Sequence, residues 1–151
     1  MNYGEQNQNT VVISYNGEYW NDGSGIHSST DGKGDEIKQY LYTQGESYHY
    51  NKVFPMFDQP NLKARLNFQV NCPKKWEFIT NTGLKHSTET ETTKSLAFNE
   101  TPLISTYLYG FVAGDYVEID HGFEGFHNGL PARIFCRSVL KDYFKEKFNA
   151  F

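Results

Sequence analysis

The stretch 62–71, "LKARLNFQVN", decides the fold class of this chain. Every second residue in it is apolar: Leu62, Ala64, Leu66, Phe68 and Val70. Successive side chains of a β-strand point to opposite faces of the sheet, so this alternation predicts a strand with one face in a core and the other in water. We therefore expect a protein built on β-sheet.

Seven further segments carry weaker strand patterns: 10–15, 36–42, 76–80, 93–98, 106–113, 116–120 and 132–137. Clusters of turn-forming residues separate them, among them "NDGSG", "TDGKGD" and "HGFEGFHNG". Short strands joined by such turns predict a mostly β protein with an antiparallel β-sandwich or a saddle-shaped sheet.

The spacing of apolar residues becomes helical from Ser138, which is the expected N-cap. The apolar stripe consists of Leu140, Tyr143, Phe144, Phe148 and Phe151. The chain is thus divided into a polar N-terminal extension (1–9), a β domain (10–137) and an amphipathic C-terminal α-helix (138–151). A monomer would leave part of the stripe exposed, so we expect these five residues to form an interaction surface.

Composition limits the classes of protein that the chain can represent. Its 151 residues suit one domain that buries roughly 70% of the surface of the unfolded chain. Aromatic residues make up 17% and charged residues 21%, which excludes a disordered or coiled-coil chain. The formal charge is −4 and the basic residues are scattered, so no nucleic acid partner is expected.

Cysteine usage and the N-terminus bear on the compartment. Cys72 and Cys136 are isolated, which fits a reducing environment. The first residues, "MNYGEQNQNT", form no secretory or transit signal, and no apolar run approaches membrane-spanning length. We expect an intracellular protein, with the cytoplasm as its compartment.

One group of histidines has a superficial resemblance to a metal site. His121, Glu124 and His127 lie in "HGFEGFH". Zinc ligands on a helix need the spacing of H-E-x-x-H, and the glycines of this segment favour a loop instead. No nucleophile elbow or phosphate-binding glycine loop is present either. We therefore expect no metal site and no catalytic residue in this chain.

The stretches "YLYTQGE" (40–46) and "VFPMFDQPNLKARLNF" (53–68) resemble the N-terminal domain of aminopeptidase N-type zinc metallopeptidases, the gluzincin aminopeptidases. That family reads Tyr-Thr-Gln-aromatic-Glu, then Phe-Pro-Cys-Phe-Asp-Glu/Gln-Pro, then Lys-Ala and a strand. Further likeness lies at "TPLISTYLYGFVAGDY" (101–116) and "PARIFCRSVLKDYF" (131–144). The resemblance covers about 11–148.

The resemblance implies a saddle-like β domain packed on a thermolysin-like catalytic domain. Gln44 matches the glutamine that lines the pocket for the first side chain of the substrate. Glu46 matches the carboxylate that binds the free α-ammonium group, a charge-assisted contact that selects peptides with a free N-terminus. Asp58 and Pro60 are interpreted as structural residues of a turn.

The sequence also departs from the family pattern. It contains neither the H-E-x-x-H helix nor the Gly-x-Met-Glu-Asn motif, so the zinc of the family belongs to a catalytic domain that has no counterpart here. Gly45 replaces the aromatic residue of the Thr-Gln motif, and Met56 replaces the cysteine. The residues His49-Tyr50-Asn51 replace the usual Asp-Ala-Arg.

Two functions follow from these observations. The missing zinc ligands favour a non-catalytic structural or interaction subunit, with protein partners in a multi-subunit assembly. The alternative is the substrate-anchoring part of a zinc aminopeptidase, with a separate catalytic domain as its partner. A third possibility is a module that binds peptides without catalysis. It is the least favoured, because half of such a pocket is missing from this chain.

Overall fold

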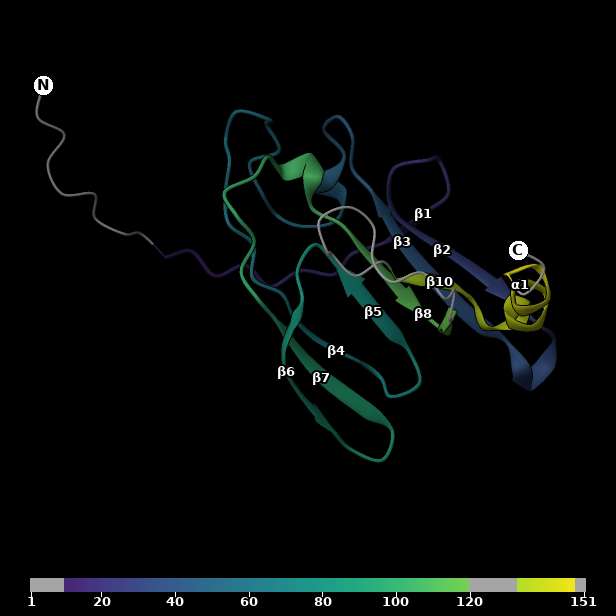
Figure 1. The fold of residues 1–151 in the computed structure, drawn as a ribbon. Coiled ribbons are helices and arrows are strands. Elements are labelled where there is room, and N and C mark those ends of the chain that lie inside the picture. Colours follow the sequence, from purple (N-terminus) through teal and green to yellow (C-terminus); the bar gives the residue numbers. More distant parts are fainter. Residues whose placement is uncertain (1–9, 120–132, 149–151) are drawn as a thin grey trace, which may run out of the picture.

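The computed structural model describes residues 10–119 and 133–148 (Figure 1). Within these residues the strands form sheets of five, three and two strands. The five-stranded sheet has the order β1 (Tyr19–Trp20), β2 (Gly25–Asp31), β3 (Lys38–Gln44), β8 (Phe111–Gly114) and β5 (Glu77–Thr80). The three-stranded sheet has the order β4 (Gln69–Pro73), β7 (Thr93–Phe98) and β6 (Leu84–Glu89). The two-stranded sheet pairs β9 (Tyr116–Ile119) with β10 (Ile134–Arg137).

Every described pairing is antiparallel except that of β1 with β2. Three short 3₁₀ turns lie between described strands, η1 (Gly34–Glu36), η2 (Tyr50–Lys52) and η3 (Thr106–Leu108), and a fourth, η4 (Ser138–Leu140), follows β10. The single described α-helix, α1 (Lys141–Phe148), follows η4 directly. The mostly β class with a C-terminal helix is therefore confirmed.

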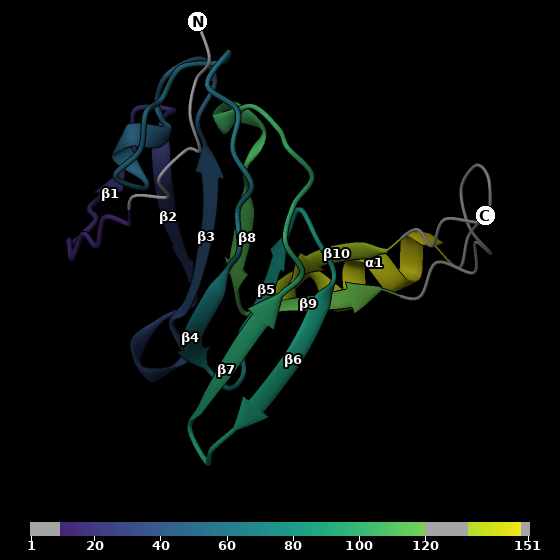
Figure 2. The same cartoon turned by 90° about the vertical axis from the view of Figure 1, so that its left-hand side faces the viewer.

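A sharp bend at Gly114 sends the chain from one sheet into the next. Only Asp115 separates β8 from β9, and Gly114 has a φ of +145°. A Cβ at Gly114 would lie 2.9 Å from the Cα of Tyr40 on β3, so a side chain cannot be placed there. Beyond this bend, β9, β10 and α1 lie together at one side of the molecule (Figure 2).

Aromatic rings connect the two buried clusters of the core. One cluster contains Tyr50, Val53 and Tyr109, and the other contains Cys72, Leu96 and Phe98. Phe68 lies between them, with ring centroids 5.6 Å from Phe54 and 5.9 Å from Phe78. These separations are typical of attractive aromatic pairs, so the sheets share one continuous core.

The alternation that predicted the fold class holds over part of its length. Leu66, Phe68 and Val70 are half-buried and their neighbours in sequence are exposed. The regular strand starts only at Gln69, because the preceding residues make just a bridge from Ala64 to Ile104. Leu62 is 46% exposed and Ala64 is also exposed, so the expectation that these two residues face the core is wrong.

Two of the other expected strands differ from the structure. Residues 10–15 form no strand: Val11 and Val12 are 78% and 87% exposed, and the segment pairs with no described strand. The first part of 106–113 is the turn η3, and the strand begins at Phe111. The pattern also missed β2 and β6, whose sequences are rich in hydroxyl and charged residues.

The C-terminal helix begins three residues later than expected, at Lys141. Ser138 does not cap it, because η4 precedes α1 and the Ser138 hydroxyl instead accepts a hydrogen bond from Lys38 Nζ at 2.8 Å. Leu140 and Tyr143 are 43% and 57% exposed, whereas Phe144 is half-buried. Phe151 and the side chain of Phe148 lie outside the described part of the chain. With eight residues, α1 is too short to cross a membrane, and no other described helix is longer.

Candidate functional site

Gln44 and Glu46 lie at the end of a central strand. Gln44 is the last residue of β3 and pairs with Gly25, the first residue of β2. The chain then makes a turn closed by a hydrogen bond from His49 N–H to the Gly45 carbonyl at 2.9 Å. We call residues 44–49 the presenting turn. The side chains of Gln44 and Glu46 are both exposed on it.

Thr43 fastens the start of the presenting turn to β8. The Phe111 N–H donates to Thr43 Oγ1 at 2.9 Å, and the Thr43 hydroxyl donates to the Phe111 carbonyl at 3.3 Å. Because the single Thr43 proton is used there, the Tyr50 hydroxyl is the donor in its 3.1 Å bond to Thr43 Oγ1. Thr43 thus joins β3, β8 and η2.

Tyr50 lies beneath the presenting turn. Its side chain is 1% exposed, and its ring packs against Phe54 and Tyr109 at 6.2 and 6.4 Å between centroids. A Cβ on Gly45 would overlap the Cδ2 and Cε2 atoms of this ring. Burial raises the pKa of Tyr50, so the phenol stays protonated and keeps its bond to Thr43.

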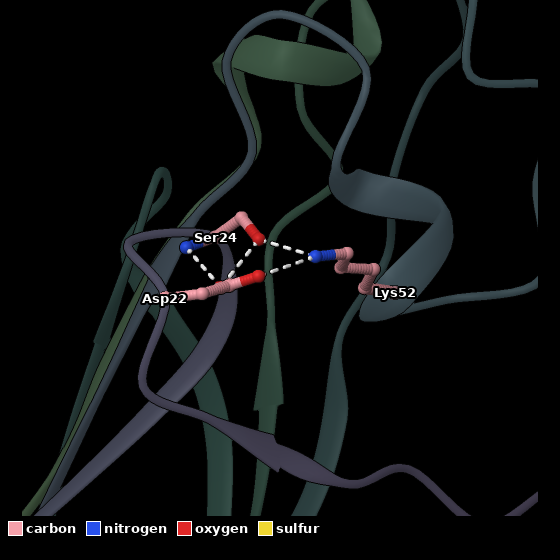
Figure 3. A network of polar contacts seen from close by, with 3 residues as sticks. All are labelled: Asp22, Ser24 and Lys52. Atoms are coloured by element: carbon pink, nitrogen blue, oxygen red, sulfur yellow. Dashed lines mark hydrogen bonds and ion pairs between the residues drawn. The ribbon is translucent and has the colours of Figure 1, made fainter.

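A second set of contacts holds η2 against the loop before β2 (Figure 3). Lys52 Nζ donates to Asp22 Oδ2 at 3.0 Å and to the Ser24 hydroxyl, and it lies 4.2 Å from the centre of the Trp20 ring. Ser24 in turn donates to Asp22 Oδ1 through its N–H and its hydroxyl. We call Asp22, Ser24 and Lys52 the clasp. Bonds from Ser24 and Lys52 lower the pKa of Asp22.

Asp58 joins the chain after η2 to η3. One carboxylate oxygen accepts from the Asn51 N–H at 3.1 Å, and the other accepts from the Thr106 hydroxyl at 2.9 Å. The Ser105 hydroxyl donates to the Pro60 carbonyl at 2.7 Å. These bonds agree with the interpretation of Asp58 and Pro60 as structural residues.

The electrostatics of the presenting turn suit a cationic ligand. The carboxylate of Glu46 makes no hydrogen bond or ion pair with any residue that the structure describes. The nearby cation in sequence, Lys52, is already paired with Asp22. An exposed carboxylate without a protein partner can accept hydrogen bonds from an ammonium group.

A groove in the described part of the chain lies away from the presenting turn. It has a volume of about 860 Å³, and its lining includes Phe54, Met56, Leu66 and Tyr109. Neither Gln44 nor Glu46 lines it. The exposed side chains of the presenting turn therefore do not belong to this groove.

The described residues do not supply a zinc site. Among residues 10–119 and 133–148, no three side chains of His, Cys, Asp or Glu gather closely enough to hold a metal ion. His121, Glu124 and His127 lie outside these residues. Both cysteines are buried and unpaired, and burial raises the pKa of each thiol.

Comparison with known proteins gives consistent matches. The model of the Peptidase M1 N-terminal domain matches residues 1–108. An "Aminopeptidase N" of Streptomyces lividans is 32% identical over 147 residues, which cover 87% of this chain and 16% of that protein. An "Aminopeptidase N" of Acetobacter pasteurianus is 32% identical over 135 residues, which cover 88% of this chain and 37% of that protein. The "Alanine/arginine aminopeptidase" of Saccharomyces cerevisiae is 34% identical over 81% of this chain.

The mostly β domain agrees with the fold class that the resemblance predicted, and in it the Thr-Gln-x-Glu segment follows the central strand β3. The chain belongs to the Peptidase M1 N-terminal domain family. It spans between 13% and 37% of the length of the three relatives named above.

Sequence reasoning missed the residues that support the presenting turn. Tyr50 and Lys52 lie in η2, and Asp22 and Ser24 lie in the loop before β2; the polar sequences of both segments gave no sign of these contacts. The glycine at position 45 is the one signal that could have pointed to Tyr50, because a glycine inside a functional motif often marks a close approach of another group.

Proposed function

We propose that this chain supplies the N-terminal domain of a zinc aminopeptidase and that its presenting turn anchors the substrate. Glu46 binds the free α-ammonium group of a peptide, and Gln44 contacts the first side chain. The zinc ligands and the reacting groups come from residues beyond those described here.

The observation that carries the proposal is the state of Glu46. Its carboxylate is exposed and has no partner among the described residues, yet its backbone is held in a closed turn on a central strand. A surface carboxylate without a ligand would not need a backbone fixed by this closed turn. A ligand with a positive charge recovers part of the hydration that the carboxylate loses on binding.

A titration followed by nuclear magnetic resonance tests the proposal. The probes are leucinamide, which has a free α-ammonium group, and N-acetyl-leucinamide, which has none. We expect leucinamide to shift the amide signals of Gly45 and Glu46 with a dissociation constant on the order of millimolar, since two exposed side chains make few contacts. The acetylated probe should leave these signals in place.

Two variants complete this test. Glu46→Gln should weaken leucinamide binding by roughly tenfold because it removes the charge. Glu91→Gln removes the same charge from an exposed hairpin turn and should bind like the unchanged protein. Equal binding of both probes, or no effect of Glu46→Gln, would contradict the proposal.

A second candidate function is that of a non-catalytic subunit that binds a protein through η4 and α1. The exposed apolar side chains of Leu140 and Tyr143 favour it, since both belong to the stripe that the sequence predicted. Measuring the native mass in a cell extract tests this candidate. A mass above that of the single chain, lost in a Leu140→Ser/Tyr143→Ser variant, supports it, and a monomer in extract overturns it.

A further inference from the structure

We propose that Tyr50 is a positioning residue for the presenting turn and that its ring replaces an aromatic side chain at position 45 as the support beneath that turn. The inference rests on the proposed function for its ligand.

Tyr50 controls the residues on both sides of Gln44. Through its hydroxyl it donates to Thr43, the residue before Gln44. Through its ring it fills the space under Gly45, the residue after Gln44. A residue fixed at both neighbours has little freedom in its own backbone, so Tyr50 determines the direction in which Gln44 and Glu46 leave the sheet.

The support beneath Tyr50 is itself rigid. The ring is 1% exposed and packs against Val53 and Tyr109 in the core. Its carbonyl accepts hydrogen bonds from Val53 N–H and Phe54 N–H, both at 2.9 Å. The clasp holds Lys52, at the other end of η2, against the loop before β2 (Figure 3). η2 is therefore fixed by packing on one end and by charge on the other.

The departures from the family motif at positions 45 and 50 together amount to moving one aromatic ring from position 45 to position 50. The motif carries an aromatic residue at position 45 and an alanine at position 50, and this chain carries Gly45 and Tyr50. An aromatic side chain at position 45 would occupy the volume that the Tyr50 ring fills. The aromatic ring now comes from Tyr50, beneath the presenting turn, and the exposed Gln44 and Glu46 remain in place.

Thermal melting of four variants tests the packing. Tyr50→Ala and Gly45→Phe should each lower the melting midpoint by roughly 10 °C, through a cavity and an overlap respectively. In Gly45→Phe/Tyr50→Ala the new ring fills the vacated space, so its melting midpoint should lie less than half as far below that of the original protein as the midpoint of either single variant. Tyr50→Phe should cost only ~3 °C, since it keeps the ring and loses one hydrogen bond. A double variant as unstable as the sum of its parents overturns the exchange.

The leucinamide titration tests the positioning role. Tyr50→Phe frees Thr43 and should reduce the preference for leucinamide over its acetylated form at least threefold. Tyr109→Phe is the matched control, because its hydroxyl makes a 2.7 Å bond to the Ala64 carbonyl, away from the presenting turn. It should lose similar stability and keep the preference.

The outcomes separate the two proposals. If Glu46→Gln leaves the preference unchanged, the proposed function fails whatever Tyr50 does. If Glu46→Gln removes the preference but Tyr50→Phe keeps it in full, Tyr50 does not position the turn. Equal losses of preference in Tyr50→Phe and Tyr109→Phe also overturn the positioning role, because a general loss of stability would then explain both.

Discussion

Asp58 binds Thr106, which lies 48 residues further along the chain, as well as Asn51, so its removal should loosen both segments. Asp58→Ala leaves the Asn51 N–H and the Thr106 hydroxyl without their acceptor. We expect the free energy of unfolding to fall by about 2 kcal/mol, the usual effect of losing bonds to a charged acceptor in a half-buried place. Urea denaturation measures this. Asp58→Asn keeps one acceptor and should lose less; an Asp58→Ala protein as stable as the original would show that the two bonds add nothing.

Asp22 makes stability depend on pH. Its bonds to Ser24 and Lys52 lower its pKa in the folded protein below the ordinary value of 3.8. The folded state therefore binds this proton more weakly than the unfolded state does, and the contribution of Asp22 is present above about pH 4 and lost as the pH falls further. Denaturation midpoints of the original protein and of Asp22→Asn should differ at pH 7 and converge in acid. A gap that stays constant down to pH 2 would contradict this assignment.

At the scale of elements, strands of the same sheet should respond differently to the same change. Leu96, on the central strand β7, is 7% exposed, whereas Leu84, on β6, is 50% exposed. Leu96→Ala should lower the free energy of unfolding by about 3 kcal/mol because it leaves a cavity beside Cys72 and Phe98. Leu84→Ala should cost less than ~1 kcal/mol. Calorimetric melting of the two variants decides, and equal losses would place Leu84 in the core as well.

The elements that sequence reasoning predicted correctly are those with apolar periodicity. β7 was predicted at its observed bounds because its burial alternates along the strand, and β5 and β10 were predicted to within two residues from their short apolar runs. β2 and β6 were missed because pairing with neighbours, and not apolar burial, holds their polar residues in a sheet. Residues 10–15 have strand-forming side chains but no described neighbour to pair with. The Gln44 and Glu46 positions followed from the motif, while Tyr50 required knowledge of the fold.

At the scale of the whole molecule, polar contacts attach β10 to the five-stranded sheet. Arg137 donates to Asp31 at 2.9 Å and to Ser29 at 3.2 Å, and its guanidinium carbon lies 5.1 Å from the centre of the Tyr40 ring. Arg137→Met should reduce the protection of β10 amides from hydrogen exchange and cost about 1 kcal/mol at low salt, since the pair is partly exposed. Arg133→Met removes a pair to Glu118 across the β9–β10 sheet and is the matched control. Unchanged exchange in Arg137→Met would mean that the contacts of Arg137 do not hold β10 against the five-stranded sheet.

The overlap between Gly45 and Tyr50 has a consequence for evolutionary history. Starting from a motif with an aromatic residue at 45 and alanine at 50, a tyrosine cannot enter position 50 while the first ring remains. The reverse order passes through a protein with two small residues, which has a cavity and can still fold. A history in which position 45 lost its bulk before position 50 gained the tyrosine avoids this overlap. Related sequences should accordingly carry one large side chain between these two positions, and a sequence with large side chains at both would refute this history.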